Sequence, residues 1–403
     1  MIGAMADARR LAAISALGLL GAVAAREGLR RARAAAPGSM LDWELVRRTA
    51  YARCGEPAAT PDAAARLSEL QPAYDGIAEE LSRPLTDLVG PGLDLGRLGS
   101  IAVVDRRGLI DRNIGIMVRI TDAIESVRAE LPAPWLQGLA RVPLSLYVGG
   151  LLAFLSRRVL GQYDPVLSLL PSALSDRPTL LVVEPNIAGF AAGGGLDVGQ
   201  ARRWLVLHEL THAWQFSAHP WLGDHLTTLL RGLVIEPLRA AGLAGAPRDR
   251  TADPLRLLRT AGRGLAGQWR AIAGLQAVMS VLEGHGNYVM REVGRGQLRD
   301  FEQLDAAFHR RQQQRSLLEQ LVVWLTGIRA KLQQYERGER FLRAVESAGG
   351  PALLARVWSG PDALPSNAEL RAPLLWVARM QAGGGPVTAA SAPLPPEPAP
   401  QPA

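Results

Sequence analysis

The stretch that decides the fold runs from Asp197 to Phe216 and reads DVGQARRWLVLHELTHAWQF. It contains the pattern His-Glu-x-x-His at His208, Glu209 and His212. Asp197 can cap a helix here, and two histidines four residues apart on a helix project from one face. Their imidazoles can therefore bind one metal ion, while Glu209 can reach a water on that metal, which is the geometry of a zinc hydrolase. The alternative is a helix whose histidines are merely partly buried.

Two histidines leave such a site incomplete, because a catalytic zinc usually has three protein ligands and a water. The longer pattern HExxHxxGxxH is not met, since Gln215 and Ala218 stand where it requires glycine and the third histidine. The best candidate for the third ligand is Glu283, in the apolar stretch Leu275–Val293, which we predict to be helical. A carboxylate is costly to bury on such a helix unless it is paired or ligating.

The same stretch carries His285 and Tyr288. We predict that His285 hydrogen-bonds to a ligand or to the reacting group, with metal ligation and a structural role as the alternatives. Tyr288 is a candidate oxyanion donor, and core packing is the alternative for it. Gly284 and Gly286 flank His285, and each glycine costs up to about 1 kcal/mol inside a helix. They therefore indicate close approach of a bulky group or of another backbone.

The composition of the 403-residue chain predicts a mainly α fold with a small β element. Hydrophobic residues make up 48% and charged residues 21%, which excludes a wholly disordered or fibrous protein. Aromatic residues are only 5%, which argues against an all-β sandwich. Two short β-branched runs, 100–105 and 179–184, are predicted strands, and the glycine-rich run 191–195 is predicted to be a flexible loop. The single cysteine, Cys54, allows neither an intrachain disulfide nor a cysteine-based zinc site.

The net charge of +7 does not by itself indicate a nucleic-acid partner. The basic residues are almost all arginines, and they are scattered along the chain instead of forming one block. Nucleic acid binding needs basic groups clustered along a phosphate backbone. We therefore predict no nucleic-acid partner, and the sequence leaves the oligomeric state open.

Both ends of the chain differ from its middle. Residues 1–39 are predicted to form an apolar and basic extension, whose run Leu11–Ala25 would span roughly 22 Å as a helix, short of the roughly 30 Å bilayer core. Three interpretations stay open: peripheral membrane contact through residues 6–35, a secretory signal, or a membrane anchor. Residues 40–382 are predicted to be one folded domain in the cytoplasm, with membrane association or secretion as alternatives. Residues 383–403 are predicted to be a disordered, proline-rich tail.

Several segments resemble one known family. HELTHAWQF at 208–216 and LEGHGNYVM at 282–290 are similar to the actinobacterial zincin-like proteins labelled DUF2342, also called coenzyme F420 biosynthesis-associated proteins. The resemblance covers about residues 41–381 and includes LGQYDP at 160–165 and KLQQYERGERF at 331–341. It implies a mostly helical, zincin-like metallohydrolase with zinc at the His-Glu-x-x-His motif. The family's name reflects an association with a deazaflavin cofactor, for which this sequence holds no signature.

We predict a zinc-dependent hydrolase, most simply a metallopeptidase that acts on a peptide or protein. Zinc would be held by His208, His212 and Glu283, and Glu209 would take the proton of the zinc-bound water and pass it to the leaving amine. The strand at 179–184 is predicted to offer its edge to an extended peptide. The alternatives are a non-proteolytic zinc-binding or scaffold protein that retains the motif, and a membrane-associated interaction protein.

Overall fold

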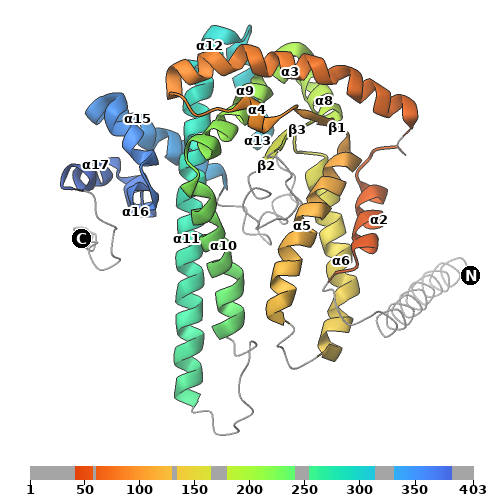
Figure 1. Cartoon of the computed structure of the whole chain (residues 1–403), viewed down its shortest axis with the longest axis vertical. Coiled ribbons are helices and arrows are strands. Elements are labelled where there is room, and N and C mark those ends of the chain that lie inside the picture. The colour runs from red at the N-terminus through yellow and green to blue at the C-terminus, as the bar shows by residue number, and fades with distance from the viewer. Residues whose placement is uncertain are drawn as a thin grey trace, which may run out of the picture.

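A computed structural model describes residues 41–57, 60–128, 134–164, 179–240, 254–313 and 331–383. Within them the protein is mostly helical with one small sheet, as the composition predicts. Figure 1 shows two long helical pairs that extend to the same side of the sheet: α5 (Arg106–Arg128) with α6 (Pro134–Ser156), and α10 (Trp221–Ala240) with α11 (Pro254–Glu292). The predicted extension 1–39, with its membrane and signal interpretations, lies outside the described residues, as does the tail beyond residue 383.

The first two described helices begin at side-chain caps. In α2 (Trp43–Arg53), the N-cap Asp42 accepts a hydrogen bond from the backbone of Leu45, and α3 (Pro61–Val89) is capped by Thr60 in the same way. Both caps satisfy amides that the first helical turn leaves without partners. Helix α3 continues through Pro72 as one element, and the short α4 (Leu95–Leu98) follows it.

Apart from the main core, a smaller apolar cluster forms where α2 packs against α5 (Arg106–Arg128) and α6 (Pro134–Ser156). Gly149 of α6 allows the closest contact, because a Cβ there would lie 2.7 Å from the carbonyl oxygen of Val46. Helix α6 buries Val148 and Leu152 in this cluster and exposes the opposite face. Among the described residues, no helix combines the length and apolarity that a bilayer crossing requires.

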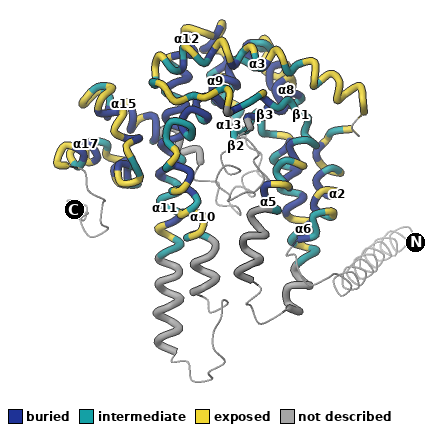
Figure 2. The backbone as a smooth tube through the Cα atoms, in the orientation of Figure 1, coloured by how far each residue is buried: buried dark blue, intermediate teal, exposed yellow. Residues whose placement is uncertain are grey.

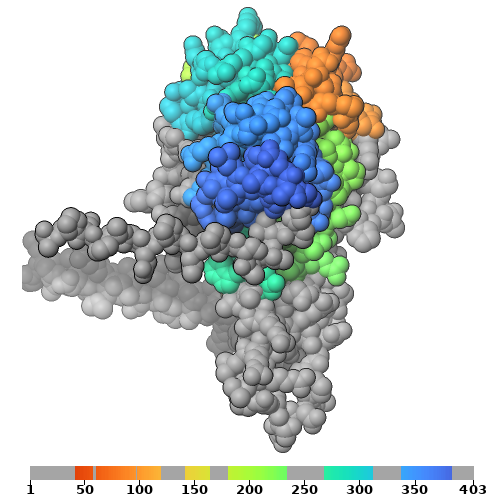
Figure 3. Space-filling model, turned by 90° about the vertical axis from the view of Figure 1, so that its left-hand side faces the viewer, coloured from red at the N-terminus to blue at the C-terminus, as the bar shows by residue number. Residues whose placement is uncertain are grey.

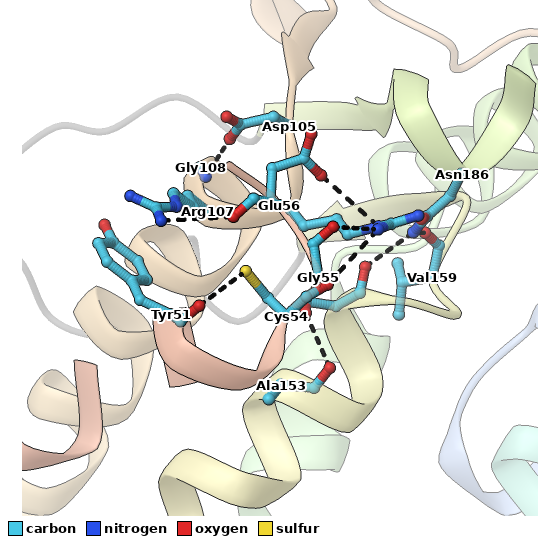
Figure 4. Close-up of polar contacts among 12 residues, drawn as sticks. Tyr51, Cys54, Gly55, Glu56, Asp105, Arg107, Gly108, Ala153, Val159 and Asn186 are labelled. Atoms are coloured by element: carbon cyan, nitrogen blue, oxygen red, sulfur yellow. Dashed lines mark hydrogen bonds and ion pairs between the residues drawn. The ribbon is translucent and has the colours of Figure 1, made fainter. Parts of the chain in front are cut away.

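Polar contacts join this cluster to the rest of the protein (Figure 4). Arg106, at the start of α5, donates to the carbonyl oxygens of Cys54 and Gly55 and to the side chain of Asn186. Asn186 in turn donates to backbone carbonyls at the end of α6 and just beyond it, at Val159. These bonds give donors to backbone carbonyls of which those of Cys54 and Ser156 belong to buried residues.

The sheet contains β1 (Ala102–Val104), β2 (Gly161–Asp164) and β3 (Thr179–Val183) in the order β1-β3-β2. Strands β1 and β3 run parallel, with Val103 opposite Val182, and β2 runs antiparallel to β3, with Tyr163 opposite Leu180. The two predicted strands are confirmed. The predicted role of the 179–184 edge is wrong, because β3 is the central strand and both of its edges are already paired.

Two helices follow β3. Helix α8 (Glu184–Gly194) begins with Pro185 in its first turn and ends at Gly195, whose φ of 62° is the left-handed conformation that glycine adopts easily. The predicted flexible loop at 191–195 is therefore wrong, since these residues form the last turn and cap of a helix. Helix α9 (Val198–Ala218) is capped by Asp197, which accepts a hydrogen bond from the backbone of Gln200, as predicted.

Among the remaining helices, α10, α11 and α13 contact α9. Two helices, α10 and α11, pack along each other, and the C-terminal helices α15 and α16 pack on α11. Figure 2 shows buried segments around α9 and also along α2 and α6, and Figure 3 shows the helices from α15 to α17 covering one side of the molecule. The elements are α10 (Trp221–Ala240), α11 (Pro254–Glu292), α12 (Gly294–Gln297), α13 (Phe301–Gln313), α15 (Lys331–Ala355), the 3-10 turns Arg356–Trp358 and Pro361–Ala363, α16 (Asn367–Arg371) and α17 (Pro373–Gln381).

Candidate metal centre

Helix α9 carries its polar motif into the main hydrophobic core. The leucines and tryptophans around the motif are buried on almost every side of the helix, so the motif cannot turn toward solvent. His208 and Glu209 are buried, and His212 is partly buried. Glu283 of α11 is also buried. Buried groups of this kind are expensive unless they are paired or bind a cation, so their mutual geometry is decisive.

Three side chains converge on one point. The Nε2 atoms of His208 and His212 lie 3.2 Å apart. Glu283 Oε2 lies 3.8 Å from Nε2 of His212 and 4.0 Å from Nε2 of His208. A triangle with these sides has a centre about 2.1 Å from each corner, which is the length of a bond from zinc to nitrogen or oxygen. The three donors therefore fit one metal ion.

The hydrogen bonding of Glu283 agrees with a cation at that point. Its Oε2 atom is buried, and no described residue donates a hydrogen bond to it. A buried carboxylate oxygen without a donor is destabilising, because it has lost its water and gained nothing in exchange. A cation between this oxygen and the two imidazoles removes that penalty. Two imidazoles and one carboxylate are also a donor set that catalytic zinc uses.

The surroundings of His208 keep its ring neutral and fixed. The ring stacks on Trp204, with centroids 5.6 Å apart and planes 9° apart. Burial, with a smaller contribution from the charge of His212, holds the pKa of His208 well below its usual value. The neutral form is the one that binds metal. Gly286 of α11 leaves room for this ring, because a Cβ there would lie 3.3 Å from His208 Cε1.

The other flanking glycine lets two helices touch. A Cβ on Gly284 would lie 2.4 Å from the carbonyl carbon of Gly338, and one on Gly338 would lie 1.8 Å from the oxygen of Ser280. Helices α11 and α15 thus cross with their backbones in contact. The prediction that the glycines around His285 allow close approach of another group is confirmed at both positions. Gly286 leaves room for the His208 imidazole, and Gly284 leaves room for the backbone of α15.

Comparisons with known proteins identify the family of this chain. Residues 41–377 match the family described as zincin-like metallopeptidase. The chain belongs to this family. The crystal structure of a "putative hydrolase with a novel fold" from Chloroflexus aurantiacus is similar, with 32% sequence identity and a TM-score of 0.64 over 85% of this chain and 100% of that one. Among curated proteins, none matches.

Membership of the zincin-like family confirms the broader part of the resemblance drawn from the sequence. It implies a metal, typically zinc, and a hydrolase. The narrower likeness to actinobacterial DUF2342 proteins stays a prediction. The three convergent side chains, His208, His212 and Glu283, are those that the sequence predicted as ligands.

In this zincin-like chain, Glu209 lies beside the three donors without joining them. Its Oε2 accepts a hydrogen bond of 2.9 Å from the backbone N–H of Tyr163 in β2. Burial raises the pKa of Glu209 to about 7, although the charge of His212 and the bond from Tyr163 act in the opposite direction. A carboxyl that titrates near neutral pH suits a general base.

The two remaining predicted residues lie farther from the donor cluster. His285 is buried and stacks on Trp214 with centroids 5.4 Å apart, and burial lowers its pKa to about 3, so the ring is neutral. The hydroxyl of Tyr288 donates to Glu346 Oε1 at 2.8 Å. Tyr288 can serve an oxyanion only by releasing Glu346. The catalytic roles of His285 and Tyr288 stay predictions.

Gln215 is a buried residue of the site to which the sequence alone assigns no role, since there it only occupies a glycine position of the longer motif. Its Oε1 lies 2.9 Å from Nδ1 of His212, and its Nε2 lies 3.1 Å from Nδ1 of His285. The available signal was its spacing, because residues three apart on a helix are neighbours on its surface.

Proposed function

We propose that this protein is a zinc-dependent peptidase whose metal ligands are His208, His212 and Glu283. The observation that carries the proposal is a shared point about 2.1 Å from the three donor atoms. One of these atoms, Glu283 Oε2, is buried and receives no hydrogen bond from any described residue. The family supports the peptide as substrate class. A zinc ion held there supplies a Lewis acid and lowers the pKa of coordinated water to about 7.

The chain's own residues account for the proton movements. Glu209 accepts the proton of the attacking water and delivers it to the leaving amine, so the peptide bond is cleaved without a free hydroxide or a free amide anion. Its pKa of about 7 makes both forms accessible near neutral pH. The N–H of Tyr163 holds the carboxyl in one orientation. The same hydrogen bond places Glu209 next to β2. We therefore propose that an extended substrate lies beside β2, and not beside β3 as the sequence predicted.

Metal analysis and a peptide library test the proposal. We expect one zinc ion per chain in wild type and in E209Q, and cleavage of library peptides by wild type alone. E283Q is the matched ligand variant, and it should lose zinc while keeping its fold, measured by circular dichroism. Cleavage that persists in pure E209Q would reject the mechanism. Zinc binding without any cleavage by wild type would instead favour the non-proteolytic zinc-binding alternative.

A further inference from the structure

We propose that Gln215 is a positioning residue that fixes the tautomer and orientation of His212 and couples this imidazole to His285. The inference rests on the proposed function, because it takes His212 as a metal ligand. Gln215 lies on α9 three residues after His212, and its side chain is completely buried. A buried amide must satisfy both its oxygen and its nitrogen, so its contacts are informative.

The backbone of α11 decides which way the amide points. Gln215 Nε2 lies 2.9 Å from the carbonyl oxygen of Leu282, which can only accept a hydrogen bond. The amide NH2 must therefore face Leu282, because the reversed amide would place two carbonyl oxygens against each other. This leaves Oε1 of Gln215 facing Nδ1 of His212 at 2.9 Å.

That oxygen fixes the protonation of the imidazole. An amide oxygen only accepts, so Nδ1 of His212 must carry the proton and donate it to Gln215. The lone pair of His212 is then on Nε2, the atom that faces His208 and Glu283. A ligating histidine usually has its other ring nitrogen held in this way, because the bond sets the ring's orientation and makes it a stronger ligand.

The second hydrogen of the same NH2 group extends the chain to His285. Nδ1 of His285 lies 3.1 Å from Gln215 Nε2, so it accepts, and the proton of the neutral His285 ring is on Nε2. Gln215 thus ties α9, which carries two ligands, to the turn of α11 that carries Glu283. The other ligand is held differently, since Nδ1 of His208 has no hydrogen-bond partner among the described residues and its ring is stacked on Trp204.

Zinc affinity separates a positioning role from a general structural one. Q215M keeps the length of the side chain and removes every hydrogen bond, and we expect it to weaken zinc binding 10- to 100-fold in chelator competition. The matched control is Q200M, on the same helix, where the buried Gln200 lies about two turns before His208 and accepts a hydrogen bond from the backbone of Arg299. Q200M should bind zinc within about threefold of wild type, as expected for a residue that touches no ligand.

The visible spectrum of the cobalt-substituted protein adds a readout of geometry. We expect Q215M to shift or broaden the bands, because His212 is free to rotate, and Q200M to keep the wild-type spectrum. Wild-type zinc affinity together with an unchanged cobalt spectrum in Q215M would overturn the inference while leaving the proposed function intact. Wild type that binds no zinc would instead refute the proposed function itself.

A measurement on the zinc-free wild-type protein needs no variant to fold. The chain has only six histidines, so nitrogen NMR of histidine-labelled protein can resolve each ring. We expect the Nδ1–H tautomer for His212 and the Nε2–H tautomer for His285. A His212 ring with an unprotonated Nδ1 would show that Gln215 does not direct it, and would overturn the inference.

Discussion

Replacing Glu209, the proposed general base, should make the metal-free protein more stable. Burial raises the pKa of Glu209 from 4.5 to about 7. Between these values the folded protein holds a proton that the unfolded chain releases, so stability that is complete below pH 4.5 is lost as the pH rises through 7. About 2.5 pKa units at 1.36 kcal/mol each correspond to a loss of roughly 3 kcal/mol. E209Q removes this titration and still accepts the hydrogen bond from Tyr163.

Urea unfolding of chelator-treated protein measures the effect. At pH 8 we expect the free energy of unfolding of E209Q to exceed that of wild type by up to about 3 kcal/mol, with the two equal near pH 4. Added zinc should shrink the gap at pH 8, because a nearby cation favours the charged carboxylate. E80Q is a control for which the change in stability should have the opposite sign. The hydrogen bond from Arg203 lowers the pKa of the exposed Glu80, so the charged form of this carboxyl is the favoured one in the folded protein.

Two results would refute this reasoning. One is equal stability of metal-free wild type and E209Q at pH 8, which would mean that the buried carboxylate is not destabilising. The other is a gap that widens toward acid pH, since a raised pKa can only make the wild-type protein lose stability as the pH rises. Activity alone would reveal neither, because we expect E209Q to be inactive whatever its stability.

Two glycine variants test the packing around the site. G286A should push a methyl group onto the ring of His208 and weaken zinc binding roughly tenfold in chelator competition, as for other changes around a ligand, whereas G267A on the same helix meets nothing within 4 Å and should keep wild-type affinity. G338A would place a Cβ 1.8 Å from the oxygen of Ser280, so we expect a loss of about 1–3 kcal/mol in thermal unfolding. A G338A protein as stable as wild type would contradict the close crossing of α11 and α15.

The predictable parts of the site depend on local rules. Asp197 signals the start of a helix, and the spacing of His208 and His212 places them on one face whatever surrounds the helix. Glu283 was identifiable because a carboxylate in an apolar stretch needs a partner, and the glycines beside it indicated tight packing. Each of these inferences uses only residues within a few positions of one another.

The parts that the sequence does not predict depend on contacts with other segments, or on glycines in a role that their type disfavours. Strand β2 is only four residues long and is defined by its pairing with β3, so nothing in Gly161–Asp164 itself indicates a strand. The run 191–195 was misinterpreted because glycine is weak inside a helix, yet here it closes one, and Gly195 supplies the left-handed cap. Gln215 became meaningful only when Leu282 and His285 were placed beside it.

The backbone contact between Gly284 and Gly338 also bears on how the chain matures on the ribosome. Helix α15 follows α11 in the chain and crosses it with the backbones in contact, so this contact can form only after α15 has been synthesised. Until then we expect the nascent chain to present the two imidazoles without a firmly held carboxylate at Glu283. We therefore expect metal to be acquired late, after translation of the C-terminal helices, and a product truncated before residue 331 to bind zinc no better than an isolated pair of histidines.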